Sequence, residues 1–131
     1  MDANLRAFVR ERASRRCEYC RFPESFAYHT FHVEHIVPLK HGGGDDKANL
    51  ALACRNCNLH KGPNLSGIDA TTGQVTELFN PRTESWSDHF VFQGFRLEGK
   101  SATGRVTVQV LSMNDPDQLA IREAVGLFSA E

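Results

Sequence analysis

The sequence lacks long apolar runs and a large net charge, we expect no secretory leader, and each of these points excludes some classes of protein. No stretch approaches the roughly 18 apolar residues that a membrane span needs. The N-terminal stretch MDANLRAFVRERASRR is basic, but it has no apolar centre of the kind that a signal peptide requires. With 40% apolar and 24% charged residues, the composition predicts a soluble globular protein of the cytoplasm without a membrane partner.

Net charge is also nearly absent, at −1, but the charges are distributed unevenly along the chain. Residues 1–64 hold 10 Lys and Arg against 7 Asp and Glu, whereas residues 65–131 hold 5 against 9. The basic part also contains all four cysteines and five of the six histidines. This small excess of positive charge favours an anionic partner at the N-terminal part.

Cysteine is scarce but ordered, because the four cysteines form two CxxC pairs, Cys17 with Cys20 and Cys54 with Cys57. Two such pairs are typical of a tetrahedral zinc site in which each pair supplies two thiolates. A thioredoxin-like dithiol is the alternative for a cytosolic CxxC, but it needs one pair within a βαβ frame. The spacing therefore predicts a closed, structural zinc site with a substantial element looped out between the pairs.

The segment between the pairs, and the residue after the second pair, contain groups suited to divalent-cation chemistry. Glu34 offers a hard oxygen ligand for Mg²⁺ or Mn²⁺. His35 beside it can accept a proton from water near neutral pH. Asn58 follows the last cysteine and offers an amide oxygen. A carboxylate, a general base and an amide around one cation suit the hydrolysis of a phosphodiester.

Strand geometry leaves an alternative open for this cation. On a regular strand Glu34 and His35 point to opposite faces, whereas His32 and Glu34 share one face. Glu34 and His35 can serve together if the strand twists or ends near them. If the strand stays regular, His32 and Glu34 become the rival pair of metal ligands.

In the basic part, apolar spacing predicts a helix over about residues 3–16 and a strand over about residues 27–37. Residues 50–61 are interpreted as a second helix, which the following Gly-Pro pair would end. The polar face of the first helix is rich in arginine, which suits either solvent or phosphate groups. Asn49 stands before the expected second helix, where an N-cap is one interpretation of it.

Beyond residue 64 the pattern becomes β-rich and shows no cluster of chemical groups. Residues 90–97 and 105–111 are expected to pair as a hairpin, because valines alternate with polar residues in the second run. Asp115 followed by Pro116 predicts the start of a closing helix. The apolar stripe of this helix would be formed by Ile121, Val125 and Phe128. We expect residues 65–131 to be an extension that completes the core.

The segment HVEHIVPLKHGGGDDKANLALACRNCNLHKG resembles the HNH (His-Asn-His) endonuclease family, of the ββα-metal class, in its form stapled by four cysteines. The resemblance covers roughly residues 17–64. It rests on an ordered set of motifs, namely CxxC, Glu-His-Ile-x-Pro, a Gly-Gly loop, Asn-Leu, and CxxC-Asn-x-x-Lys.

Together with the expected elements, the resemblance implies an α+β fold. It would consist of a ββα-metal core stapled by a four-cysteine zinc site, an N-terminal helix, and a β-rich C-terminal extension ending in a helix. Residues 1–131 would form a single domain, with 17–64 as the nuclease core and 65–131 as the extension.

Carried over by position, the family pattern implies roles for individual residues. Glu34 corresponds to the acidic metal ligand, and His35 corresponds to the general base. Asn49 corresponds to the middle Asn, which would hold the loop and orient His35 rather than touch substrate. Asn58 would be the second protein ligand of a catalytic Mg²⁺ or Mn²⁺. His60 is an alternative ligand, but a two-residue step on a helix turns about 200°, so His60 would more readily contact DNA or solvent.

The resemblance therefore implies a metal-dependent DNA endonuclease that hydrolyses phosphodiester bonds, nicking or cutting duplex DNA with a His base. Arg55 and Lys61, with the N-terminal arginines, would contact phosphates without reading the sequence. A zinc-stapled nucleic-acid-binding module that has lost catalysis is the alternative. The two hypotheses differ in whether Glu34, His35 and Asn58 act together.

Overall fold

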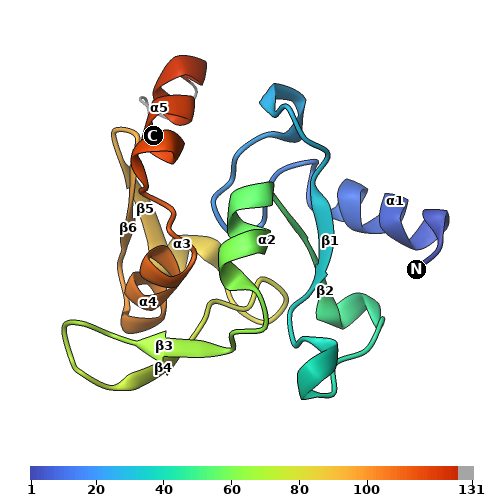
Figure 1. Ribbon diagram of the computed structural model, residues 1–131, viewed down its shortest axis with the longest axis horizontal. Helices are drawn as coiled ribbons and strands as arrows, with labels where there is room; N and C mark the ends of the chain where they lie inside the picture. The colour runs from blue at the N-terminus through green and yellow to red at the C-terminus, as the bar shows by residue number, and fades with distance from the viewer. Residues whose placement is uncertain (127–131) are drawn as a thin grey trace.

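The computed structural model describes residues 1–126 of the 131-residue chain. Its helices are α1 (Ala3–Arg12), α2 (Arg55–Lys61), α3 (Trp86–His89), α4 (Ala102–Val110) and α5 (Pro116–Val125). Its strands are β1 (His32–His35), β2 (Leu50–Ala53), β3 (Ser66–Ile68), β4 (Val75–Glu77), β5 (Phe90–Gln93) and β6 (Arg96–Gly99). Short 3₁₀ turns lie at Glu24–Phe26, Leu39–His41 and Lys47–Asn49. The strands pair as three separate antiparallel hairpins, β1 with β2, β3 with β4, and β5 with β6 (Figure 1).

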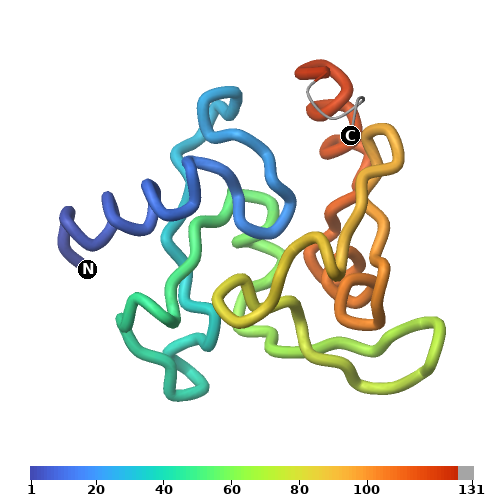
Figure 2. The backbone as a smooth tube through the Cα atoms, turned by 180° about the vertical axis from the view of Figure 1, so that it is seen from behind, coloured from blue at the N-terminus to red at the C-terminus, as the bar shows by residue number. Residues whose placement is uncertain are grey.

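The first hairpin, β1–β2, is the frame on which the N-terminal part is built. Its register places Glu34 opposite Ala51 and His35 opposite Leu50. Every residue of β2 is buried, because α1 and α2 contact the hairpin from opposite sides (Figures 1 and 2). The guanidinium of Arg12, at the end of α1, donates to the carbonyl oxygens of Lys47 and Leu50, at 2.8 and 2.6 Å. The helix is thereby tied to the start of β2.

The expected helix over residues 50–61 is wrong in its first third. Residues 50–53 form β2, and the helix α2 begins only at Arg55. The cause is non-local, since the run Leu-Ala-Leu-Ala pairs with β1 and is buried on both faces, which removes the alternation expected of a strand. Cys54 then caps α2, with its Sγ accepting from the backbone N–H of Cys57. Asn49 is therefore not a helix N-cap. The strand expected over 27–37 is also shorter than predicted, since β1 spans only His32–His35.

The second correction concerns residues 105–111, which form most of helix α4 rather than a strand. The partner of β5 in its hairpin is β6. Helix α4 is capped by Ser101, whose Oγ accepts from the N–H of Gly104 at 3.0 Å. It packs against both C-terminal hairpins, so it buries a polar residue, Thr107, as well as Val106. Thr107 tolerates this burial because its hydroxyl donates to Thr103 O and accepts from Phe79 N. The alternation of valines and polar residues in this run therefore occurs in a helix, and the prediction of a strand from it is wrong.

The closing helix α5 is present, with Asp115 at the N-cap and Pro116 at its first position, as predicted. Its expected apolar stripe is only partly confirmed. Val125 packs against the core, but Ile121 is 42% exposed, and Phe128 lies outside the described residues. The buried residue of α5 is Arg122, which is 1% exposed. Its guanidinium donates to Phe95 O, Met113 O and Asn114 Oδ1.

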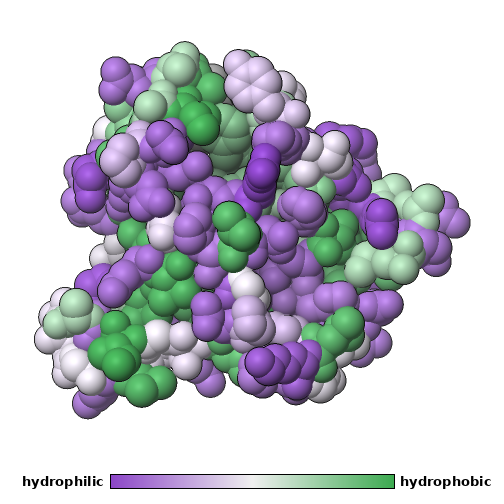
Figure 3. Space-filling model, viewed as in Figure 1, coloured by the Kyte–Doolittle hydropathy of each residue, from purple (hydrophilic) through white to green (hydrophobic). Residues whose placement is uncertain are grey.

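The fold belongs to the α+β class, as the sequence predicted. The C-terminal extension is less β-rich than expected, because its helices contain more residues than its short strands. Buried apolar side chains of both parts form one core cluster, in which the cysteines lie beside aromatic residues. Ile68 and Val75, cross-strand partners in the β3–β4 hairpin, are both exposed, and Figure 3 shows hydrophobic surface over this hairpin. None of the described helices is long and apolar enough to cross a membrane.

Candidate functional site

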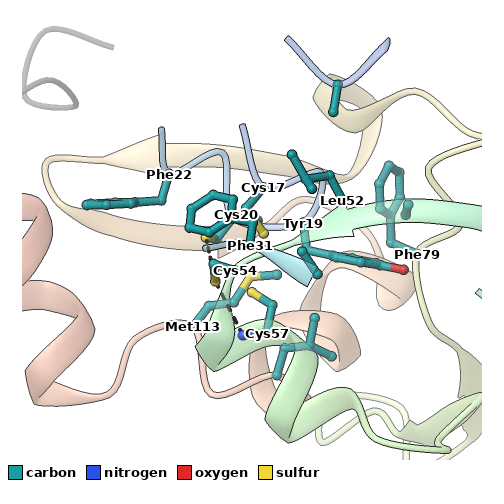
Figure 4. Close-up of a cluster of buried hydrophobic side chains, with 14 of the residues drawn as sticks. Cys17, Tyr19, Cys20, Phe22, Phe31, Leu52, Cys54, Cys57, Phe79 and Met113 are labelled. Carbon is teal, nitrogen blue, oxygen red and sulfur yellow. Dashed lines mark hydrogen bonds between the residues drawn. The ribbon is translucent and has the colours of Figure 1, made fainter. Parts of the chain in front are cut away.

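The four cysteines meet in one buried cluster. Cys17 and Cys20 come from the turn that follows α1, and Cys54 and Cys57 come from the start of α2. Their sulfur atoms all lie within 4.8 Å of one another, and Figure 4 shows them gathered between the two chain segments. The cluster is the one group of this kind among residues 1–126. The four cysteines are thus positioned to form a metal site.

The spacing of the sulfur atoms fits zinc. Tetrahedral zinc with a Zn–S distance of about 2.3 Å places its sulfur ligands about 3.8 Å apart. The Sγ atoms of Cys20 and Cys54 are 3.7 Å apart. In each pair the backbone N–H of the second cysteine also donates to the Sγ of the first, at 3.4 Å, which closes a tight knuckle.

Burial and mutual hydrogen bonds shift the pKa of three of the four cysteines. Burial opposes its charge, but hydrogen bonds from the other three thiols hold the pKa of Cys17 well below its usual range. Hydrogen bonding to Cys17, together with burial, raises the pKa of Cys20 and that of Cys57. The cluster therefore concentrates negative charge in an apolar interior, where a cation would stabilise it.

Glu34 points into the interior between β1 and α2. Its side chain is 7% exposed, and its two oxygen atoms have different partners. Oε1 accepts from the Tyr19 hydroxyl, and Oε2 lies 3.1 Å from the Lys61 Nζ. Burial raises the pKa of Glu34, an effect that Lys61 and Tyr19 partly offset. Burial and the charge of Glu34 raise the pKa of Tyr19 well above its usual value, so Tyr19 stays a donor.

His35 is the last residue of β1, so the strand ends here, and the partner of its side chain differs from those of Glu34. Its Nε2 lies 2.7 Å from Oδ1 of Asp45, which follows the glycine loop. The hydrogen bond to His35 lowers the pKa of Asp45, so this carboxylate is ionised near neutral pH. A carboxylate partner on Nε2 favours the tautomer in which Nδ1 carries the lone pair. The His35 ring is therefore oriented and able to accept a proton at Nδ1.

Asn49 spans the loop that joins β1 to β2. Its Oδ1 accepts from Val37 N, and its Nδ2 donates to Val37 O and Gly44 O, at 2.9 to 3.0 Å. Gly43 lies inside this loop, where an added Cβ would stand 1.7 Å from Val37 O. Gly42 adopts a φ of 89°, in the left-handed region. The loop that carries Asp45 is thereby fixed relative to the end of β1.

Helix α2 brings a second set of predicted residues to the hairpin. Lys61 is 2% exposed, and its Nζ donates to His35 O and Ile36 O as well as pairing with Glu34. Asn58 lies one turn earlier, on the same side of α2 as Lys61, and therefore faces the Glu34 side of the hairpin. The expectation that Lys61 contacts DNA phosphates conflicts with its burial, because its ammonium is already engaged inside the protein.

The other candidate ligands and phosphate contacts lie further out. His32 is exposed at the start of β1, although it shares a strand face with Glu34. His60 Nδ1 bonds to Asn56 O within its own helix, at 2.9 Å. Arg55 is exposed, and its Nη1 donates to His29 Nε2 at 2.7 Å. The structure therefore joins Glu34 to Lys61 of α2, whereas His60 is bonded within its own helix and His32 is exposed.

The arginines of the N-terminal helix are mainly structural. Arg10 donates to Phe31 O, and Arg12 donates to carbonyls at the start of β2. Arg15, three residues beyond the end of α1, pairs with Glu11 of that helix. These bonds occupy guanidinium groups that were candidates for phosphate contact, and those of Arg10 and Arg12 tie the helix to the β1–β2 hairpin.

Sequence analysis missed several residues of this site. Tyr19 and Glu18 lie between the first two cysteines, and Asp45 lies in the glycine loop. Glu18 accepts from Leu52 N at 2.8 Å and pairs with Arg82 of the extension. The acidic group after the glycine run was a signal that could have pointed to Asp45. Nothing local pointed to Tyr19, because its partner lies 15 residues further along the chain.

Comparison with known proteins agrees with this geometry for one part of the chain. Residues 17–64 match the model of a family described as HNH endonuclease. The match confirms the resemblance for this segment, and the four-cysteine cluster corresponds to the zinc-stapled form of the family.

A curated relative extends the similarity beyond this segment. The Septu protein PtuB of Bacillus thuringiensis is 30% identical over 118 residues, which cover 83% of this chain and 40% of that protein. The chain thus spans about two fifths of the length of the relative that it matches. No solved structure gives a significant match. Together, the family match and this relative support the interpretation that the chain is a member of a nuclease family.

Proposed function

We propose that this chain, in which residues 17–64 match the HNH endonuclease family, is a metal-dependent endonuclease that hydrolyses phosphodiester bonds of DNA. The observation that carries the proposal is the hydrogen bond between His35 and Asp45. His35 directly follows the buried Glu34 on β1. A buried acid and an oriented imidazole on neighbouring residues supply the two groups that metal-assisted hydrolysis requires.

In this proposal His35 is the general base. Asp45 holds the ring through Nε2, so Nδ1 can take a proton from the attacking water. Asn49 keeps the loop of Asp45 in register with the end of β1. Arg55, exposed on α2, would contact a phosphate of the substrate without reading the base sequence.

Glu34 and Asn58 would hold the divalent cation, Mg²⁺ or Mn²⁺. The donor set fits such an ion, because both groups offer hard oxygen atoms and come from β1 and α2, which contact each other. Both carboxylate oxygens of Glu34 keep a lone pair beside the bonds from Tyr19 and Lys61. The cation would supply stabilisation of negative charge on the phosphate and the leaving oxygen.

The cysteine cluster would bind zinc as a closed structural site, since four thiolates leave no open position. Four buried thiols without a disulfide suit a reducing compartment, so we also propose a cytoplasmic location. We further propose that residues 17–64 are the nuclease core of one domain, and that the C-terminal extension supports this core.

A nucleic-acid-binding module without catalysis is the second candidate. The observation that favours it is the pairing of Glu34 with Tyr19 and Lys61, which gives the carboxylate a structural role of its own. In that case the protein would bind duplex DNA but would leave it intact.

A plasmid-nicking assay with Mg²⁺ or Mn²⁺ separates the two candidates. The zinc-loaded wild type is expected to nick supercoiled DNA, and His35→Ala is expected to reduce the rate by about 10² to 10⁴-fold. His41→Ala is the matched control, because the side chain of this histidine is exposed and bonds to a loop carbonyl, Pro63 O. Duplex binding without nicking by the wild type, or equal nicking by wild type and His35→Ala, would rule out the proposed enzyme.

A further inference from the structure

Glu18 and Tyr19 lie between Cys17 and Cys20. Their side chains bond outside the sulfur cluster, to Leu52 and Glu34. Figure 4 shows the ring of Tyr19 pointing away from the sulfur atoms, with its hydroxyl group beside Phe79. The Tyr19 side chain is fully buried, and its hydroxyl donates to Oε1 of Glu34. The zinc-binding turn therefore touches the carboxylate that we assign to the catalytic cation.

We propose that Tyr19 is a positioning residue, which fixes the Glu34 carboxylate for the catalytic cation and couples that carboxylate to the zinc-binding turn. The inference rests on the proposed function, because it concerns the same carboxylate. It adds a residue that acts through Glu34 rather than on the substrate.

Contacts on several sides fix the position of Tyr19, so its hydroxyl group can position another side chain. Its ring meets Phe79 edge to face, with centroids 6.4 Å apart at 85°. Its backbone oxygen accepts from the indole Nε1 of Trp86 at 2.8 Å. Its neighbours in the turn, on either side, are Glu18, bonded to β2, and the metal ligand Cys20. The hydroxyl thus has a defined place relative to the hairpin.

The Glu34 carboxylate is consequently restrained from two directions. Lys61 approaches Oε2 from α2, and Tyr19 approaches Oε1 from the zinc-binding turn. Lys61 supplies charge, and it would keep doing so without the hydroxyl. A phenylalanine would fill the same space as Tyr19, so the hydroxyl contributes the orientation of one carboxylate oxygen. Partners of this kind orient metal-binding carboxylates, and their loss typically lowers metal affinity about 10- to 100-fold.

The chain offers a matched pair of variants, because Tyr19 and Tyr28 are its two tyrosines. Tyr28 is fully exposed, so Tyr28→Phe controls for loss of a hydroxyl as such. Mn²⁺ binding to the zinc-loaded full chain is measured directly by calorimetry or by electron paramagnetic resonance. Tyr19→Phe is expected to bind Mn²⁺ about tenfold or more weakly, with unchanged zinc content. Its kcat for nicking is expected to fall at limiting Mg²⁺ and to recover in excess Mg²⁺.

The outcomes separate this inference from the proposed function. A wild type that binds Mn²⁺ and nicks DNA, together with a Tyr19→Phe variant of equal Mn²⁺ affinity, overturns the inference and leaves the enzyme intact. A wild type that binds no Mn²⁺ overturns both. A weaker Tyr19→Phe beside an unchanged Tyr28→Phe supports the inference.

A second measurement covers the case in which Tyr19→Phe does not fold. In the Tyr28→Phe protein, Tyr19 is the sole tyrosine, so ¹³C labelling at Cζ of tyrosine gives a single resonance. Saturation with Mg²⁺, verified by calorimetry, is expected to shift this resonance because the hydrogen-bond acceptor becomes cation-bound. A resonance that does not move on saturation, or an absence of Mg²⁺ binding, contradicts the inference.

Discussion

Residues 17–64 and residues 65–126 are stabilised by different interactions. The first part contains the sulfur cluster and the buried polar groups Glu18, Glu34 and Lys61. Among its described residues the second part has no sulfur cluster. It also buries three polar groups, Asp69, Thr107 and Arg122, beside apolar core residues, among them Leu78, Phe79, Phe90, Leu97, Val106 and Leu111. Buried charges add little net stability unless they are fully paired, whereas apolar burial stabilises directly. The sulfur cluster is therefore the difference between the two parts, and we expect the first part to depend on a bound metal and the second on side-chain packing.

The largest expected effect is the loss of the sulfur cluster. Cys57→Ser removes one of four thiolates, and we expect loss of zinc together with a destabilisation on the order of 5 kcal/mol or more. The measurement combines zinc content with thermal unfolding followed by circular dichroism. If Cys57→Ser, or the wild type after zinc removal, unfolded at the same temperature as the zinc-loaded wild type, the first part would not depend on metal.

A smaller effect is expected from a cavity in the packing part. Leu97 is 1% exposed, and Leu97→Ala is expected to cost about 2–5 kcal/mol while zinc stays bound. Leu59→Ala, at a side chain 70% exposed on α2, is the control and should change stability by about 0.5 kcal/mol or less. Urea unfolding and zinc content check both variants. Loss of zinc from folded Leu97→Ala would erase the distinction between the two parts.

The smallest effect concerns the one ion pair that anchors α4 to the β3–β4 hairpin among the described residues. Arg105 donates to both oxygens of Asp69, at 3.0 and 2.9 Å, and these bonds hold the pKa of Asp69 well below its usual range. A depressed folded-state pKa stabilises the fold above the unfolded pKa of about 3.9, and this contribution is lost as pH falls through the folded pKa.

Asp69→Asn should therefore be less stable than wild type at pH 7, and the difference should shrink below about pH 4. Unfolding by urea at several pH values measures it, with Asp88→Asn, at an exposed side chain, as the control. A difference that stayed constant between about pH 7 and about pH 3 would show that the carboxylate charge is not what Arg105 stabilises.

The sequence predicted what depends on short spacing. The CxxC pairs indicated one cluster, and Asp115 with Pro116 marked the start of α5. Asp115 and Pro116 are neighbours in the chain. The cysteines of each pair are also close in sequence, and two such pairs are typical of a single metal site. The family resemblance added the roles of Glu34, His35 and Asn58, which stay predictions until the nicking assay is done.

The features that the sequence did not predict depend on partners far along the chain. Leu50 and its neighbours became a strand because β1 pairs with them, and Thr107 could be buried because Phe79 supplies a donor. Lys61 was expected at the surface, where most lysines lie. It is buried because its ammonium group pairs with Glu34 and donates to the carbonyl oxygens of His35 and Ile36. No local pattern carries that information.

The glycine loop has a consequence for how the sequence can vary. Gly43 has no room for a methyl group, and Gly42 has a backbone conformation that other residues rarely adopt, whereas an added Cβ at Gly44 would meet nothing within 4 Å. The three glycines are adjacent in the sequence, but they differ in which substitutions they tolerate. Diversification should therefore leave the first two positions as glycine and admit many residues at the third, whose contribution to the loop is its backbone oxygen.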